Sequence, residues 1–267
     1  MSTRAVHAAP RGSGTPAREE GVMPATRLLL PAVGVLAAAN VLNNRAARRL
    51  APLTSAAATG ALVLLGRRGG LSWPEMGFTD ARRGARIGGC LAAAVAAVYT
   101  AGVLLPPTRR YFRDQRALGL SRARLAEEIL LQVPFGTVLL EEVAFRGVLP
   151  AALRRSHGPS AAVAGSSALF GLWHILPSLD MAAANPALGH LVQAADPPAT
   201  RPAKGGAAAT VAGSVAVTGL AGAFFLELRR RGGLLAPSLL HLATNSLGFL
   251  AARATRRLDR GGRGTAD

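Results

Sequence analysis

The stretch LLEEVAFRGVL (residues 139–149) places two adjacent carboxylates and a guanidinium inside a segment, about 129–153, that is otherwise apolar. An ionisable side chain at the centre of a bilayer costs roughly 2.5–3.5 kcal/mol on insertion scales, so its presence needs a structural or functional reason. The other twelve of the 14 acidic residues lie in tails, in loops or at the ends of apolar runs. We therefore expect this stretch to lie at a polar site within a membrane-embedded fold.

Uncharged runs before and after this stretch are long enough to cross a bilayer as helices, which takes about 20 mostly apolar residues. Together with 129–153 they make seven candidate spans, the other six being 28–44, 50–66, 87–107, 156–179, 205–226 and 232–252. Ala, Leu, Val and Gly dominate the runs, and small residues let helices approach closely in lipid. The sequence predicts an all-α, polytopic transmembrane helix bundle of about seven to eight helices, with the membrane domain over residues 26–256.

The net charge of +17 is arranged as short arginine clusters between the apolar runs, and only 17% of the 267 residues are charged. A nucleic-acid-binding domain would gather its basic residues on one face, so we expect no nucleic-acid partner. The clusters instead indicate the ends of membrane spans, where they can attract anionic lipids of the bilayer. We expect an integral protein of a bacterial plasma membrane. Lys and Arg are divided almost equally between the two sides of the seven spans, which leaves the orientation open.

The segments outside the spans are polar, and the single cysteine excludes an intramolecular disulfide. We expect Cys90 to be a small buried residue, and Met23 to be the true start of the chain. No secretory signal peptide is recognisable. We expect a disordered polar tail at 1–25 and a polar tail at 257–267. We further expect an aqueous loop at 180–204 and an interfacial segment at 67–86.

The charges in the central stretch allow two interpretations. On a helix, Glu142 and Arg146 stand four residues apart and can form an ion pair, whereas Glu141 points about 100° away. One interpretation is a structural ion pair with Glu141 as a bystander. However, one Glu would suffice to match one Arg. The second carboxylate therefore favours a functional interpretation.

Two other apolar runs carry polar residues near their middle. ALFGLWHILPS (168–178) contains His174, and SLLHLATNSLGF (238–249) contains His241 and Asn245 on one helical face. Either histidine alone could be an ordinary core residue, but three helices that each offer such groups favour a hydrolytic site. A buried carboxylate can act as general base on a water, and a His with an Asn amide can donate to an oxyanion. A Glu/His/His metal site from three helices remains geometrically possible.

Three motifs resemble those of the CPBP family, the CAAX protease and bacteriocin-processing family, also called Abi, which includes the type II prenyl-protein endopeptidases. They occur in order over about residues 125–252, the predicted catalytic core, and read Glu141-Glu142-x-x-x-Arg146, Phe170-x-x-x-His174 and His241-x-x-x-Asn245. The SWPEMGF stretch (72–78) is similar to the segment that precedes them in the family. The resemblance implies a bundle of about eight helices.

The resemblance also implies an intramembrane endopeptidase of the glutamate type that acts on a peptide or membrane-protein substrate. Glu141 would activate a water with help from His174, and Arg146 would orient Glu142. His241 and Asn245 would form the oxyanion site, with Phe170 packing beside it. No metal or other cofactor is expected, because the Asn amide is a natural donor and a poor zinc ligand.

Two other classes of function stay open at this point. A non-catalytic membrane scaffold, or a peptide-binding protein of the bacteriocin-immunity type, would keep the cavity without needing the chemistry. A proton-coupled transporter would use Glu and His as relays inside the membrane. Such a transporter is expected to carry two matched, Gly- or Pro-broken half-sites, and the sequence shows no internal repeat of that kind.

Overall fold

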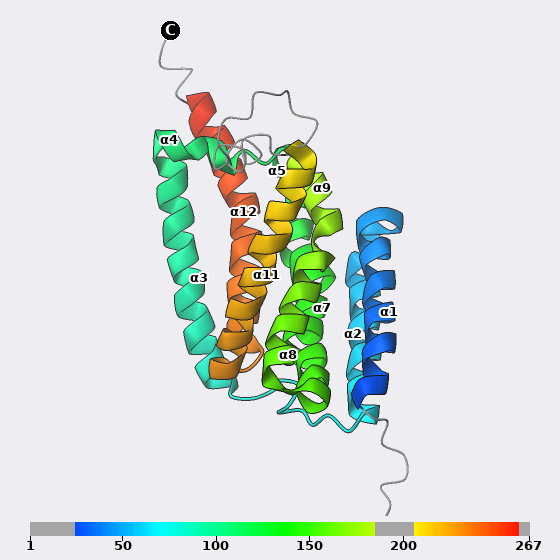
Figure 1. Ribbon diagram of the computed structural model, residues 1–267. Helices are drawn as coiled ribbons and strands as arrows, with labels where there is room; N and C mark the ends of the chain where they lie inside the picture. The colour runs from blue at the N-terminus through cyan, green and yellow to red at the C-terminus, as the bar shows by residue number, and fades with distance from the viewer. Residues whose placement is uncertain (1–24, 185–205, 262–267) are drawn as a thin grey trace, which may run out of the picture.

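The computed structural model describes residues 25–184 and 206–261, and these residues form helices and turns without a strand. Figure 1 shows the long helices side by side, with α1 and α2 at one flank of the bundle and α3 at the other. Their bounds are α1 Ala25–Val41, α2 Ala51–Arg68, α3 Ala81–Leu104, α4 Pro106–Arg109, α5 Gln115–Leu118, α6 Arg122–Glu127, α7 Leu139–Glu142, α8 Leu149–Trp173, α9 Ile175–Ala184, α11 Gly206–Gly232 and α12 Leu235–Gly261.

Six helical segments of the described chain are long and apolar enough to cross a membrane, in agreement with the predicted helical bundle. The longest, Arg122–Asp180, has 59 residues, which at 1.5 Å per residue would reach about 90 Å and exceed one bilayer crossing. It folds back at Gly158, whose φ of 85° and ψ of 176° are not helical. The Ser166 hydroxyl then donates to the Phe145 carbonyl at 2.6 Å, so the two arms run antiparallel. These arms contain the spans predicted at 129–153 and 156–179.

The first two predicted spans, 28–44 and 50–66, lie in two helices that form a hairpin. Helices α1 and α2 pack against each other and are joined through a π-helical turn at Leu42–Ala46 and a 3₁₀ turn at Arg48–Leu50. Helix α9 continues to Ala184, so the predicted loop at 180–204 begins as helix. Most of that loop, Met23 and the tail up to residue 24 lie outside the described residues.

Helix α12 continues to Gly261, so the first residues of the predicted polar tail, 257–267, are helical. Arg253 and Arg256 donate to the carbonyls of Leu120 and Leu118, at 2.6 and 2.8 Å. These bonds fix the last turns of α12 against the segment that precedes α6. The helix therefore persists in a region whose composition alone is typical of a tail. Residues 262–267 lie outside the described part of the chain.

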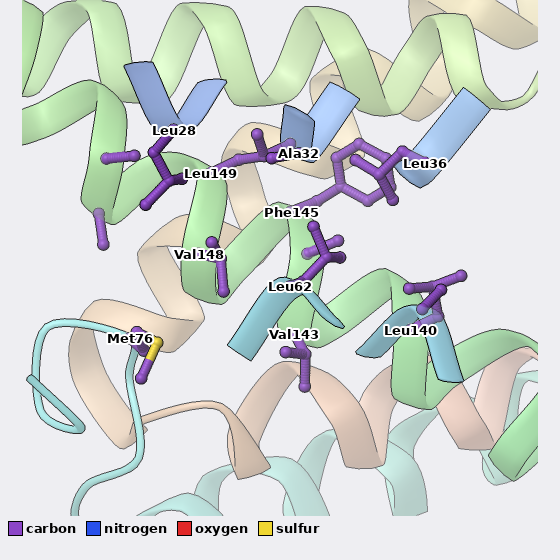
Figure 2. Packing of buried hydrophobic residues seen from close by; sticks show 14 of the residues in the cluster. Leu28, Ala32, Leu36, Leu62, Met76, Leu140, Val143, Phe145, Val148 and Leu149 are labelled. Atoms are coloured by element: carbon purple, nitrogen blue, oxygen red, sulfur yellow. The ribbon is translucent and has the colours of Figure 1, made fainter. Parts of the chain in front are cut away.

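The main core lies between the α1–α2 hairpin and the arm that carries the two glutamates. Leu28, Ala32 and Leu36 line one face of α1 at intervals of four residues, and Figure 2 shows them packed toward Phe145 and Leu149. Small and branched side chains fill this contact without a charge. The glutamate arm is thus buried by apolar residues next to its polar site.

Cys90 is exposed, which contradicts the expectation that it would be buried. Several large apolar residues are exposed as well, such as Leu220 with 74% and Leu53 with 70% of the residue exposed. In a membrane protein these positions face lipid. The sequence distinguishes apolar from polar segments, but an Ala- and Gly-rich helix such as α3 does not reveal which face meets its neighbours.

The glutamates lie between two stretches of wider helix. The Leu139 N–H donates to the Pro134 carbonyl and the Leu149 N–H to the Ala144 carbonyl, in each case five residues back. Glu128–Val138 and Val143–Val148 are therefore π-helical. Proline has no N–H to give, which disturbs the ordinary ladder around residue 134. Such π-helical turns occur frequently at functional sites.

Candidate active site

Glu141 lies where the glutamate arm, the end of α8 and α12 meet. It is 4% exposed, and its Oε1 accepts a hydrogen bond from the Trp173 indole at 2.8 Å. Its Oε2 has no hydrogen-bond partner in the described chain. That oxygen faces two imidazoles, with Nε2 of His241 at 3.7 Å and Nε2 of His174 at 4.0 Å. The structure thus brings together three of the predicted site residues around one oxygen atom.

His174 occupies the break between α8 and α9, with a φ of −83° and a ψ of 1°. Its Nδ1 lies 2.8 Å from the Phe170 carbonyl, which can only accept, so we assign the proton to Nδ1. The neutral ring then presents a lone pair at Nε2 toward Glu141. With 18% of its side chain exposed, His174 is the most open of the three residues around Oε2.

His241 is held by the second glutamate. Its Nδ1 lies 2.7 Å from Oε1 of Glu142, and both side chains are buried. A carboxylate accepts, so Nδ1 donates, and this bond fixes the direction in which Nε2 points toward Glu141. Glu142 therefore orients His241, a contact that the sequence did not predict.

Arg146 is fully buried and lies 3.4 Å from Glu142, measured from Nη1 to Oε1, as the spacing predicted. Its guanidinium nitrogens make no hydrogen bond within the described chain. Instead the group lies over the rings of Phe170 and Phe225, 3.8 and 4.7 Å from their centroids. Ring faces attract cations most strongly in dry surroundings. Charge and the two rings together hold this arginine.

Asn245 lies one turn after His241 on α12, so the two share a helical face as predicted. It is half-buried and makes no hydrogen bond to the described residues. Among these residues, no group of three or more His, Cys, Asp or Glu side chains is arranged to hold a metal ion.

Sequence reasoning missed three residues of the site. Trp173 was not among the predicted site residues, although a buried indole N–H needs an acceptor. Phe225 covers Arg146 from α11. Asn40 of α1 donates to the Trp173 carbonyl at 2.9 Å and ties the hairpin to the site. A polar residue inside the otherwise apolar first span, near its end, was the available signal for Asn40.

A comparison with protein families gives one match. Residues 127–247 match the family model described as type II CAAX prenyl endopeptidase, Rce1-like. No curated protein and no solved structure matches the chain significantly. The matched segment covers slightly less than half of the chain and contains all six predicted site residues: Glu141, Glu142, Arg146, His174, His241 and Asn245. Over residues 127–247 the chain is therefore similar to the Rce1-like type II CAAX prenyl endopeptidases, in agreement with the resemblance of its three motifs.

Proposed function

We propose that this protein is an intramembrane endopeptidase in which Glu141 activates a water that attacks the peptide carbonyl. The family match supports a CAAX-type membrane protease in general. The glutamate mechanism is carried by one observation: Oε2 of Glu141 is buried, has no hydrogen-bond partner and faces the Nε2 atoms of two histidines.

The distances around Oε2 suit a bridging water. At 3.7 and 4.0 Å the two imidazole contacts are longer than direct hydrogen bonds, and a polar contact of this length is commonly bridged. Such a water could donate one proton to Glu141 and the other to Nε2 of His174. Both acceptors would then direct its lone pair toward a substrate carbonyl.

The reaction follows the usual course of general base catalysis. Glu141 takes a proton as the water oxygen bonds to the carbonyl carbon, which forms a tetrahedral oxyanion. The C–N bond then breaks, and the proton passes from Glu141 to the leaving amine. Asn245 and His241 would donate to the oxyanion. His241 can do so from Nε2 only as an imidazolium, whose charge the Glu142 carboxylate would balance.

Glu141→Gln tests this mechanism, because it keeps the shape of the side chain and removes the base. We expect processing to fall by about 10²- to 10⁴-fold, the usual contribution of a general base. The measurement is mass spectrometry of peptides released by membranes that carry each variant. Glu227→Gln is the matched control, since Glu227 pairs with Arg230 and Arg231 on the exposed side of α11. Wild-type processing by Glu141→Gln would favour a non-catalytic scaffold and overturn the proposal.

The apolar helices and the protease family make this an integral membrane protein. We further propose that it resides in a bacterial plasma membrane and that its substrate is a peptide or a membrane-protein segment. Fractionation of the cells that express it natively, followed by detection of the protein, tests the location.

A further inference from the structure

An open groove of about 820 Å³ lies between the C-terminal halves of α3 and α12, with the start of α6 beside it. It belongs to the end of the bundle at which α12 finishes and α4 begins (Figure 1). Its volume falls within the range of small-molecule binding sites, about 300–1,000 Å³. None of the residues around Glu141 lines it.

The groove has apolar walls. Val103 and Leu104 of α3 stand opposite Leu247 and Leu250 of α12, and Leu125 adds the wall from α6. At the other end of the same helix pair, α3 approaches α12 through a glycine: a Cβ on Gly88 would lie 2.8 Å from the Ala236 carbonyl oxygen. The helices are thus in close contact at one end and leave an apolar groove at the other.

The rim of the groove is strongly positive. Its sixteen lining residues include five arginines and no Asp or Glu, the arginines being Arg122, Arg253, Arg256, Arg257 and Arg260. The nearest acid on α12, Asp259, is already paired with Arg113 at 2.8 Å and with Arg109 at 3.6 Å. The charge of the groove is therefore not balanced by its own lining.

Three of these arginines are available to a ligand. Arg253 and Arg256 each give one nitrogen to a backbone carbonyl. Arg122, Arg257 and Arg260 are exposed, and they form no ion pair or hydrogen bond with the described residues. Guanidinium groups bind phosphate oxygens in a bidentate manner, so this rim is suited to a phosphate group.

We propose that the groove binds an anionic phospholipid, with the phosphate at the arginine rim and an acyl chain between α3 and α12. The acyl chain would contact the apolar walls and the phosphate the arginines, since the apolar walls continue directly into a basic cluster at the end of the helices. Basic pockets between membrane helices are known to recognise anionic headgroups. A bound lipid would also fill the space between the C-terminal halves of α3 and α12.

The site is distinct from the proposed catalytic centre. Leu247 follows His241 by six residues, which is about 9 Å along the helix axis. The proposal therefore does not depend on the peptidase mechanism, and the variants that test it leave Glu141 and the histidines unchanged.

The experiment uses the full-length protein in bilayer discs made from equal amounts of phosphatidylglycerol and phosphatidylcholine. After extraction into detergent, native mass spectrometry reports which lipid stays bound. The groove variant is Arg122→Gln with Arg257→Gln and Arg260→Gln. The control is Arg82→Gln with Arg83→Gln and Arg86→Gln, which removes the same charge from exposed positions at the other end of α3.

Wild type and the control are expected to retain phosphatidylglycerol in preference to phosphatidylcholine. The groove variant should lose about tenfold or more of this preference, because each arginine near the lipid surface contributes to it. A filling variant, Ala254→Phe, should reduce retention without a change of charge. Equal preference in the groove variant and the control would overturn the proposal, since charge anywhere on the surface would then explain the binding. Undiminished retention in Ala254→Phe would equally overturn it.

Discussion

The Trp173 indole donates to Oε1 of Glu141 at 2.8 Å, so the residue that precedes His174 in the chain positions the carboxylate that His174 faces. Phe145 packs against the same indole, with ring centroids 5.6 Å apart. One side chain thus links the first and second motifs through a hydrogen bond and a ring contact. It leaves the second carboxylate oxygen for chemistry.

Trp173→Phe should keep the ring contact and remove the donor. We expect a loss of about 1–3 kcal/mol in the free energy of unfolding, the cost of a buried acceptor without a partner. We also expect kcat to fall while KM changes little, because the base loses its orientation but the proposed oxyanion donors, His241 and Asn245, are unchanged. Trp73→Phe, at the half-exposed second tryptophan, is the control and should change neither quantity.

Arg146→Lys should destabilise the protein by about 3 kcal/mol. A lysine ammonium cannot lie flat on the rings of Phe170 and Phe225, so the buried charge would lose both ring contacts. Arg155→Lys provides the comparison, because Arg155 pairs with Glu75 where both side chains are more than one-third exposed. This variant should cost less than about 1 kcal/mol in the free energy of unfolding. Thermal unfolding in detergent measures both. Equal stability of the two variants would show that the rings do not hold Arg146.

Two adjacent glycines of α3 should respond in opposite directions to alanine. A Cβ on Gly88 would lie 2.8 Å from both the Ala236 carbonyl oxygen and the Leu239 Cβ, whereas a Cβ on Gly89 meets nothing within 4 Å. Gly88→Ala should therefore cost about 1–3 kcal/mol through overpacking. Gly89→Ala should be neutral or stabilise by up to about 1 kcal/mol, since alanine favours the helix. Unfolding measurements in which both behave alike would contradict the close approach of α3 and α12.

The loop between α2 and α3 should show a pH response. A hydrogen bond from the Arg155 side chain, assisted by Ser72, lowers the pKa of Glu75 from its ordinary value of 4.5 to about 2. Because the folded-state pKa is the lower one, this contact stabilises the fold above pH 4.5. Its contribution is lost as the pH falls from 4.5 toward 2.

Glu75→Gln should remove that part of the acid sensitivity of the melting temperature, with a small loss of stability at neutral pH. The effect should stay below about 1 kcal/mol, because the pair is partly exposed and screened by solvent. Arg155→Gln should flatten the same region of the curve. An unchanged acid limb in both variants would show that the pair does not report on folding.

The sequence predicted the helical bundle and the resemblance to the family because each depends on local patterns. Uncharged length identifies a span, and polar residues that interrupt a span identify a site. Glu142 near Arg146 followed from helical spacing alone. These inferences need no knowledge of how the helices are arranged.

Contacts between helices were beyond the reach of such patterns. The bond between Glu142 and His241 joins residues 99 positions apart, and the stacking of Arg146 on Phe225 depends on how α11 rotates. Cys90 was misplaced for the same reason, since rotation decides whether a face meets lipid or a helix. The continuation of α12 to Gly261 required the carbonyls of another segment.

The reversal at Gly158 constrains the number of residues between the turn and each of the two motifs that it brings together. Phe145 meets Ser166 and Glu141 meets Trp173, so residues before the turn lie beside residues after it. One residue inserted between Arg146 and the turn would shift the glutamates by about 1.5 Å and rotate them by about 100° relative to the opposite arm. Glu141 would then point away from both the indole and His174. The number of residues between the turn and each motif decides which side chains of the two arms meet. Substitutions between the motifs can therefore be tolerated more readily than insertions or deletions.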